Sequence, residues 1–240
     1  MASKLQKSNT ISVIGSFAVD HITDLAGAVH KRHGGPAHWI RQTLKELRVP
    51  FLVISGRRPA LVDIHLDTNG EQGDFRRVDP IRLRTPRTAK AFIISTIENE
   101  FPIEKLHLLH GVIAVDLQGY VRNARVSGTL LHIPSSLARR IAIAKVTASE
   151  FAYLEQALIA SQKKRILIVT HGGAGFEIFY KGRRNNFTNR RILSSDTIGA
   201  GDTFLAAFVV EWLRTKNISK AALTAQGIVR RFLERKAHTI

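Results

Sequence analysis

The sequence predicts an α/β fold in which a doubly wound, mainly parallel sheet is sandwiched by helices. Short β-branched segments alternate with segments of helical periodicity along the 240 residues, a pattern typical of strand–helix–strand units. No sequence repeat and no low-complexity linker interrupts this alternation, which indicates one domain over residues 1–240. Only the stretch 57–86 breaks the rhythm, and we expect it to form a small β lid inserted in the domain.

Composition favours a globular protein. Hydrophobic residues make up 44% and charged residues 23% of the chain, and the mean hydropathy is −0.03. No apolar run has the length of a membrane span, and the polar start MASKLQKSNT lacks the apolar centre of a secretory signal, so we expect a cytoplasmic protein. The absence of cysteine excludes disulfides and thiolate metal sites.

Charge is the compositional outlier. The chain has 36 Lys and Arg against 19 Asp and Glu, a formal net charge of +17, which favours anionic partners such as nucleotides, phosphosugars or nucleic acid. The basic residues are dispersed in small groups, however, with no basic arm and no aromatic-interleaved RNA motif. A solvated basic surface and a small-molecule substrate are therefore expected, rather than nucleic acid.

The first strand is predicted over residues 11–15, ISVIG, and it carries Asp20 just past its end, at the edge of an open α/β sheet where ligands bind. The stretch 27–35 is loop-like and ends in Gly34 and Gly35. Pro36 follows, and residues 37–47 have the pattern of an amphipathic helix. This helix start is a second possible ligand loop, although an ordinary strand-to-helix connection has the same pattern.

The lid is predicted from strands of alternating polarity. VDIHL, FRRV and IRLR have a period of two, and the turn-rich TNGEQGD joins them, as in an antiparallel hairpin. The lid would also be the surface through which two copies of the chain pair. On either side of it the strand–helix rhythm predicts strands over 51–55, 91–95, 112–116, 141–146 and 165–170, a partner strand over 176–180, and helices over 149–160 and 220–236.

The stretch 196–204, DTIGAGDTF, is where we expect the chemistry. Gly199 and Gly201 precede Asp202, and behind them the segment 203–213 is apolar on nearly every face, as in a buried helix. The N-terminus of such a helix offers unpaired N–H groups and the positive end of the dipole to a phosphate, and glycine lets an anion approach closely. Asp202 would either cap the helix or accept a proton from a bound hydroxyl.

These segments together resemble the ribokinase-like carbohydrate kinases, the PfkB family, in a short variety with a GGPA sequence. DTIGAGDTF is similar to the family's second signature, and VIGSFAVD resembles its first strand with the substrate-binding aspartate. GGPAHW resembles the glycine pair that opens onto the sugar, VTHGGAG the TxGxxG loop that contacts the nucleotide, and VDLQGYVR a segment of its archaeal and sugar-kinase branches. The matches follow the family order over nearly the whole chain.

The resemblance implies ATP-dependent phosphorylation of a hydroxyl of a sugar, an inositol-like polyol or a nucleoside, with Mg²⁺ as cofactor. It implies that Asp202 is the general base and that the amides of Gly199, Ala200 and Gly201 form an anion hole. The residues that it implies for the substrate are Asp20, Gly34, Gly35 and Trp39, and those for the nucleotide are Thr170, Gly172, Gly175 and Thr197.

Two positions depart from the family pattern. Members carry an N-x-x-E motif that helps to organise magnesium at the start of the mid-chain helix, and the segment aligned with it here is 149–152, SEFA. Glu150 is the residue expected to contribute to the metal site, but Thr147 and Glu150 also fit a capping box. Trp39 replaces an asparagine common after the glycine pair, and it either stacks on a substrate ring or packs in the core, with the core favoured.

Two other functions are compatible with the sequence. One keeps the fold and changes the acceptor to a hydroxymethylpyrimidine or vitamin precursor, since related kinases share the GAGD loop. The other is a catalytically weakened, basic nucleotide- or nucleic-acid-binding protein, which the altered N-x-x-E segment and the +17 charge motivate. Retention of both glycines and Asp202 favours the enzyme.

Overall fold

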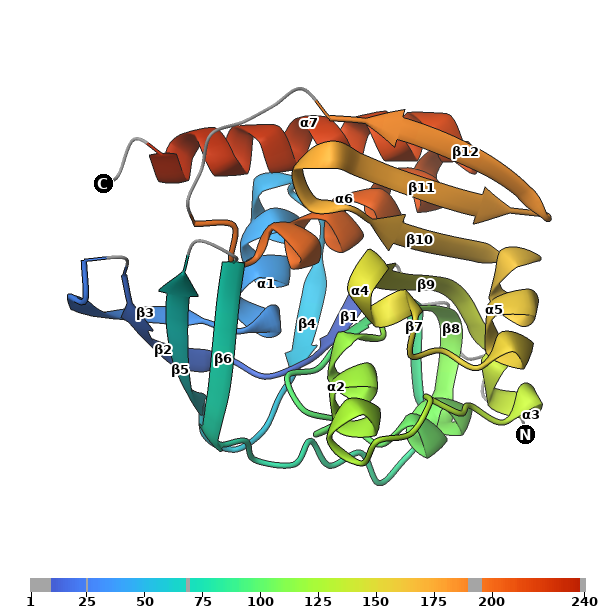
Figure 1. Cartoon of the computed structure of the whole chain (residues 1–240). Coiled ribbons are helices and arrows are strands. Elements are labelled where there is room, and N and C mark those ends of the chain that lie inside the picture. Colours follow the sequence, from blue (N-terminus) through green and yellow to red (C-terminus); the bar gives the residue numbers. More distant parts are fainter. Residues whose placement is uncertain (1–9, 25, 68–69, 190–195, 238–240) are drawn as a thin grey trace.

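The computed structural model describes residues 10–24, 26–67, 70–189 and 196–237. An eight-stranded sheet lies between two layers of helices, and a separate four-stranded sheet stands at one side (Figure 1). The α/β class predicted from the sequence, with a mainly parallel sheet and a small lid, is confirmed.

The central sheet has the strand order β12-β11-β10-β9-β8-β7-β1-β4. Every neighbouring pair from β4 to β10 is parallel, whereas β11 and β12 add an antiparallel edge. Its strands are β1 (Ile11–Ile14), β4 (Phe51–Ile54), β7 (Arg87–Ser95), β8 (Leu109–Asp116), β9 (Ile141–Thr147), β10 (Ile166–Thr170), β11 (Gly175–Tyr180) and β12 (Arg183–Thr188). Because the parallel strands end at one edge, that edge collects the polar residues that follow them.

Helices cover both faces of this sheet, because successive strand residues point to opposite sides. Ile93 belongs to the core on one face, with α1 (Pro36–Glu46), α6 (Ala200–Thr215) and α7 (Ile218–Ala237). Phe92 and Ile94 belong to the core on the other face, which is covered by η1 (Ile103–Leu108), α2 (Gln118–Val126), α3 (Ser135–Ala138), α4 (Ala148–Phe151) and α5 (Gln156–Lys163). α6 is buried along most of its length, as its apolar sequence predicts.

The lid differs from the predicted one in its strands, because it gains two from residues 18–34, whereas the expected strand IRLR is not formed and its Ile81 and Leu83 pack in the main core. It has the strand order β3-β2-β5-β6, formed by β2 (Ala18–Thr23), β3 (Val29–Gly34), β5 (Ala60–Asp67) and β6 (Gly70–Arg77). The loop expected over 27–35 was therefore wrong. β3 is an edge strand, VHKRHG, with little buried surface, so it has no apolar periodicity and is held by its pairing with β2. The Asn-Gly turn expected between β5 and β6 lies partly outside the described residues.

The helix expected over 149–160 is split into α4 and α5, which corrects the prediction. α4 ends after one turn, and Leu154 forms a β-bridge with Leu131 before α5 begins. A contact with a distant segment thus interrupts a stretch whose local periodicity predicts one continuous helix. Within the described part of the chain, no helix is both long and apolar enough to span a bilayer.

Candidate active site

The N-terminus of α6 lies at the edge of the sheet where the parallel strands end (Figure 1). Gly199 is the N-cap residue, with a left-handed φ of 87°, and Asp202 lies in the first turn. The left-handed cap lets the chain turn sharply into the helix, which a residue with a Cβ disfavours. The backbone amides of the GAGD loop are therefore presented at the partly exposed start of a helix that is largely buried from Thr203 onward.

The three amides predicted to form an anion hole are not equivalent. The Ala200 N–H donates to Thr197 O at 3.0 Å, closing a turn. The Gly199 and Gly201 amides form no hydrogen bond with another described residue. Two donors at the positive end of the helix dipole are thus available to an anion.

Ser95, the last residue of β7, holds the Asp202 carboxylate. Ser95 Oγ donates to Asp202 Oδ1 at 2.8 Å. Burial raises the pKa of Asp202 to about 7, and repulsion from Asp116 acts in the same direction, whereas the Ser95 hydrogen bond and Lys145 oppose the rise. A carboxyl group with a pKa near neutrality is suited to take a proton from a substrate at physiological pH.

A buried ion pair lies beneath the glycine loop. Lys145 Nζ is 2.6 Å from Asp116 Oδ2, and both side chains are nearly inaccessible. A Cβ on Gly201 would be 3.0 Å from Lys145 Nζ, so the ammonium lies directly against the loop. Burial disfavours the charged form, but Asp116 and Glu150 outweigh it, and the net pKa of Lys145 is raised. The charged ammonium adds positive potential to the helix N-terminus.

A cavity of about 280 Å³ lies between the lid and this loop. Three of the predicted substrate residues, Asp20, Gly35 and Trp39, line it together with Asp202. Gly34, the fourth, lies behind Asp20, where a Cβ would collide with the carboxylate. Asp20 lies in β2 of the lid rather than in a loop after β1, and the pairing of β2 with β3 brings it to the glycine pair.

Trp39 packs in the core and presents part of its ring to this cavity. Its side chain is 6% exposed, and it meets Phe232 edge to face at 5.5 Å between ring centroids. A Cβ on Gly199 would be 2.5 Å from the ring, so Trp39 supports the turn into α6 directly. Of the two roles expected from the sequence, packing accounts for this environment.

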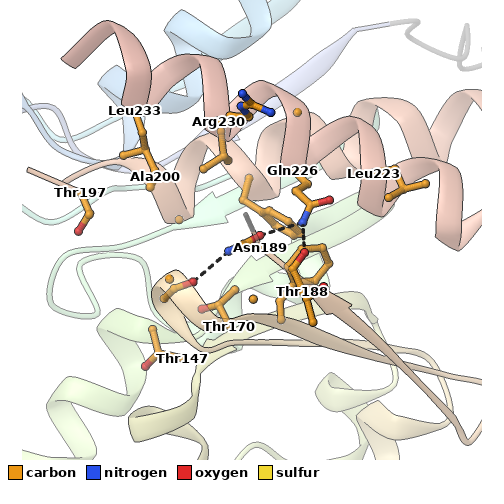
Figure 2. Close-up of a pocket in the computed structure, with 18 residues that line it drawn as sticks. Thr147, Thr170, Thr188, Asn189, Thr197, Ala200, Leu223, Gln226, Arg230 and Leu233 are labelled. Carbon is orange, nitrogen blue, oxygen red and sulfur yellow. Dashed lines mark hydrogen bonds between the residues drawn. The ribbon is translucent and has the colours of Figure 1, made fainter. Parts of the chain in front are cut away.

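A second cavity of about 730 Å³ opens on the other side of the loop (Figure 2). All four predicted nucleotide residues line it: Thr170, Gly172, Gly175 and Thr197. Its opposite wall is α7, and Figure 2 places Leu223, Gln226, Arg230 and Leu233 there. Thr147, Thr197 and Gly201 line both cavities, which therefore meet at the glycine loop.

Hydrogen bonds tie the walls of the larger cavity together. Gln226 Nε2 on α7 donates to Thr188 O at 2.6 Å and to Asn189 Oδ1 at 2.9 Å. Asn189 Nδ2 donates in turn to Gly172 O at 3.0 Å, in the short helix η2 (Gly172–Ala174) (Figure 2). The end of β12 and its following residue thus connect α7 to the glycine loop after β10.

Glu150 caps the start of α4 through hydrogen bonds with Thr147. Thr147 Oγ1 accepts from the Glu150 N–H, and Glu150 Oε2 accepts from the Thr147 N–H at 2.8 Å, which completes the capping box expected from the sequence. Because α4 begins after Thr147, the N-x-x-E spacing at this helix start is met by Thr147 and Glu150 rather than by Ser149 and Ala152. Thr147 and Glu150 thus have the spacing of that motif, with threonine at its first position.

No group of three metal-ligating side chains occurs among the described residues. A Mg²⁺ ion does not require one, because it keeps several waters and binds through one or two carboxylates and substrate phosphates. Glu150 Oε1 is not used by the cap hydrogen bonds, so the residue suits an ion of that kind.

Sequence reasoning missed Ser95, Asp116 and Lys145. Each ends or nearly ends a strand of the central sheet, next to the residues that were predicted. A signal for Lys145 was present, because it interrupts the apolar strand IAIAKV, and a lysine in a buried strand needs a partner. The identity of that partner depends on the strand order.

A sequence profile described as pfkB family carbohydrate kinase matches residues 123–228 of the chain. That stretch begins in α2, ends in α7 and includes the GAGD loop. No curated protein matches the sequence.

Solved structures of ribokinase-family enzymes match almost the whole chain. A Burkholderia thailandensis nucleoside kinase in complex with inosine is 13% identical, with a TM-score of 0.74 over 93% of this chain and 91% of that one. A pyrophosphate-dependent kinase in the ribokinase family, complexed with a pyrophosphate analog and myo-inositol, is 18% identical, with a TM-score of 0.72 over 96% of this chain and 100% of that one. An Arabidopsis thaliana ribokinase complexed with ribose and ATP is 16% identical, with a TM-score of 0.67 over 93% of each chain.

Proposed function

We propose that the chain is a pfkB-type carbohydrate kinase, since a profile of that family matches residues 123–228, and that it transfers the γ-phosphoryl group of ATP to a hydroxyl of a sugar, polyol or nucleoside. The observation that carries the proposal is the position of Asp202. It lines the smaller cavity beside Gly201, which lines both cavities, at the N-terminus of a buried helix, with a pKa raised to about 7. An acceptor on one side and a donor on the other would both reach this point.

Asp202 is the general base of the proposed reaction. Its carboxylate takes the proton of the acceptor hydroxyl as the oxygen bonds to the γ-phosphorus, and the bond from that phosphorus to the β–γ bridging oxygen breaks to release ADP. Ser95 fixes the carboxylate through its hydrogen bond. The amides of Gly199 and Gly201, with the Lys145 ammonium behind them, stabilise the charge of the transferring group.

ATP is the proposed donor rather than pyrophosphate, although one similar structure is a pyrophosphate-dependent kinase. The larger cavity extends beyond the glycine loops to the apolar side chains Phe204, Leu223 and Leu233. Pyrophosphate has no apolar part that would bury this surface, whereas a nucleotide base does. Gly172 and Gly175 would lie beside the phosphates, as the resemblance implies.

When bound, Mg²⁺ would neutralise negative charge on the phosphates of the donor. Glu150 is the residue proposed to hold the ion, through water or through Oε1. The capping box keeps the carboxylate in place at the start of α4, next to Thr147, which lines both cavities.

We propose further that residues 1–240 act as one catalytic unit, with the lid closing over the acceptor. Asp20, Gly35 and Trp39 would contact that acceptor. Pairing of two copies through the lid stays a prediction, which analytical ultracentrifugation checks.

The proposal is tested by measuring ADP release from Mg-ATP with a panel of sugars, polyols and nucleosides. Asp202→Asn should lower kcat by at least ~100-fold, since it removes the proton acceptor. Replacing ATP with pyrophosphate should abolish turnover. An Asp202→Asn variant with undiminished turnover would disprove the assigned mechanism, and turnover with no member of the panel would contradict the acceptor class.

A further inference from the structure

One cationic side chain in the smaller cavity has no part in the proposed reaction. Arg122 of α2 lines that cavity together with Gln118 on the same helix, Phe75 of the lid and Asp202. Its position on α2 places it on the layer of helices opposite to α6. The smaller cavity, in which we propose that the acceptor binds, thus has a positive charge in the wall formed by α2.

The contacts of Arg122 leave much of its hydrogen-bonding capacity unused. Its Nη1 donates to the Ile97 carbonyl, and its guanidinium lies 4.3 Å from the centre of the Phe75 ring. A guanidinium carries five N–H donors in a planar fork. The carbonyl of Ile97 and the ring of Phe75 position the group, and four of its donors have no hydrogen bond to a described residue.

No described acidic side chain forms an ion pair with Arg122. Four carboxylates favour the charged guanidinium from a distance without contacting it, namely Glu150, Glu98, Glu100 and Asp116, and the last of these is paired with Lys145.

A partly desolvated charge without a counter-ion is costly, and proteins supply one when they bury arginine. Burial lowers the pKa of Arg122, because the carboxylates at a distance offset only part of the cost of removing its charge from water. The missing partner can come from a ligand, because the guanidinium borders a cavity rather than packed core.

We infer that the acceptor carries an anionic group, a carboxylate or a phosphate, that pairs with Arg122 while its hydroxyls face Asp20 and Asp202. Arginine binds both anions through parallel N–H donors, which positions a molecule as well as attracting it. The inference rests on the proposed kinase function and narrows its acceptor to sugar acids and sugar phosphates.

Arg122 is then a specificity-determining residue. A purely structural role, in which it only supports the lid through Phe75 and Ile97, makes a different prediction. Loss of lid support would weaken every acceptor alike, whereas loss of an ion pair weakens only the charged ones.

The first experiment compares matched acceptors with the wild-type protein. Ribose, ribonate and ribose 5-phosphate form one series, and glucose, gluconate and glucose 6-phosphate form another. We expect kcat/KM for one anionic member to exceed that of its neutral parent by at least about 10-fold, the size of one charge-assisted hydrogen bond. The carboxylate and phosphate arms distinguish the two anions. Equal values for neutral and anionic members would overturn the inference.

The second experiment uses Arg122→Gln, with Arg125→Gln as the matched control. Arg125 is on the same helix but exposed, with its guanidinium over Tyr153. Arg122→Gln should raise KM for the anionic acceptor by about 10- to 100-fold with little change in kcat, and leave the neutral parent nearly unaffected. Arg125→Gln should change neither, and Arg122→Lys should recover part of the loss. An equal rise in KM for the anionic and the neutral acceptor would overturn the inference, because it would show that Arg122 only supports the lid.

Calorimetric binding of the same compounds separates this inference from the kinase function. If no acceptor is phosphorylated, binding of an anionic member that Arg122→Gln weakens at least about 10-fold would still support the role of Arg122, while the kinase proposal fails. Binding that is the same in wild type and Arg122→Gln, or absent in both, overturns the inference. Far-ultraviolet circular dichroism of each variant establishes that it is folded.

Discussion

At the scale of single residues, the site depends on how buried charges are paired. Asp202 has one strong hydrogen-bond donor, Ser95, and a neighbouring carboxylate, Asp116, whose own charge is matched by Lys145. The ion pair thus keeps the repulsion on Asp202 small enough for the group to ionise near neutral pH. A base of this kind is sensitive to the loss of any of its neighbours.

The rate of the reaction should depend on pH through Asp202. Because burial raises its pKa to about 7, the carboxyl group is protonated below that pH and cannot accept the substrate proton. We expect kcat/KM to fall about tenfold per pH unit below an inflection near 7. Ser95→Ala should move the inflection upward, since it removes a hydrogen bond that favours the carboxylate. An inflection near pH 4 would contradict this role.

Lys145→Met should destabilise the protein strongly. The substitution leaves Asp116 buried without its counter-ion, at a cost of about 3–5 kcal/mol in the free energy of unfolding. The double variant Lys145→Met, Asp116→Leu should regain much of that stability, because two apolar side chains replace the pair. Urea unfolding of the wild type and the two variants measures both effects, and a double variant no more stable than the single one would contradict them.

At the scale of elements, the start of α6 decides the geometry of the phosphate site. The left-handed cap at Gly199 is pressed against Trp39 of α1, and Lys145 of β9 lies under Gly201. The helix start is therefore fixed by a neighbouring helix and by the sheet. This rigidity is what an electrostatic site requires, since donors that must reorganise lose much of their effect.

Gly199→Ala should both destabilise the fold and impair catalysis. An alanine at φ 87° is strained, and its Cβ would be 2.5 Å from the Trp39 ring, so we expect a loss of about 1–3 kcal/mol in unfolding free energy. Gly227→Ala, within α7 and with no atom closer than 4.0 Å to the added Cβ, is the matched control. It should be neutral or stabilising in the same thermal unfolding measurement. Equal losses in the two variants would refute the strain at the cap.

At the scale of the whole molecule, one carboxylate joins the lid to the body. Asp196, just before the GAGD loop, is paired with Arg32 of the lid strand β3 and with Lys236 of α7, whose Nζ lies 2.9 Å from Asp196 Oδ1. Burial opposes ionisation of Asp196, but hydrogen bonds from Arg32 and Lys236 keep its pKa below the usual range. The pairs therefore connect the lid to the helix that lines the larger cavity.

Asp196→Asn should loosen the lid. Removing the negative charge weakens both pairs, so we expect faster hydrogen–deuterium exchange in β2 and β3 and a higher KM for the acceptor. Asp79→Asn is the control, because its pair with the largely exposed Arg58 is expected to contribute little. Unchanged exchange in β2 and β3 would show that other contacts hold the lid.

The sequence by itself determined the fold class and the positions of most site residues. Apolar segments such as RILIVT and the glycine loops after them are local patterns, and a parallel sheet brings the ends of its strands to one edge. Thr170 and the start of α6 lie at that edge for this reason, whereas Asp20 and Gly35 reach the smaller cavity through the lid strands β2 and β3. The capping box at Thr147 and Glu150 is equally local, since both partners are within one turn of helix.

Only the tertiary structure decided which charges face one another. Lys145 and Asp116 are adjacent because β8 lies beside β9, and Arg122 of α2 borders the smaller cavity where it meets Phe75 of the lid. The extent of the lid was decided in the same way, since β3 has a polar sequence and exists through backbone pairing with β2. Contacts between distant segments leave no periodic signal in the sequence, because their energy comes from the packing of whole elements.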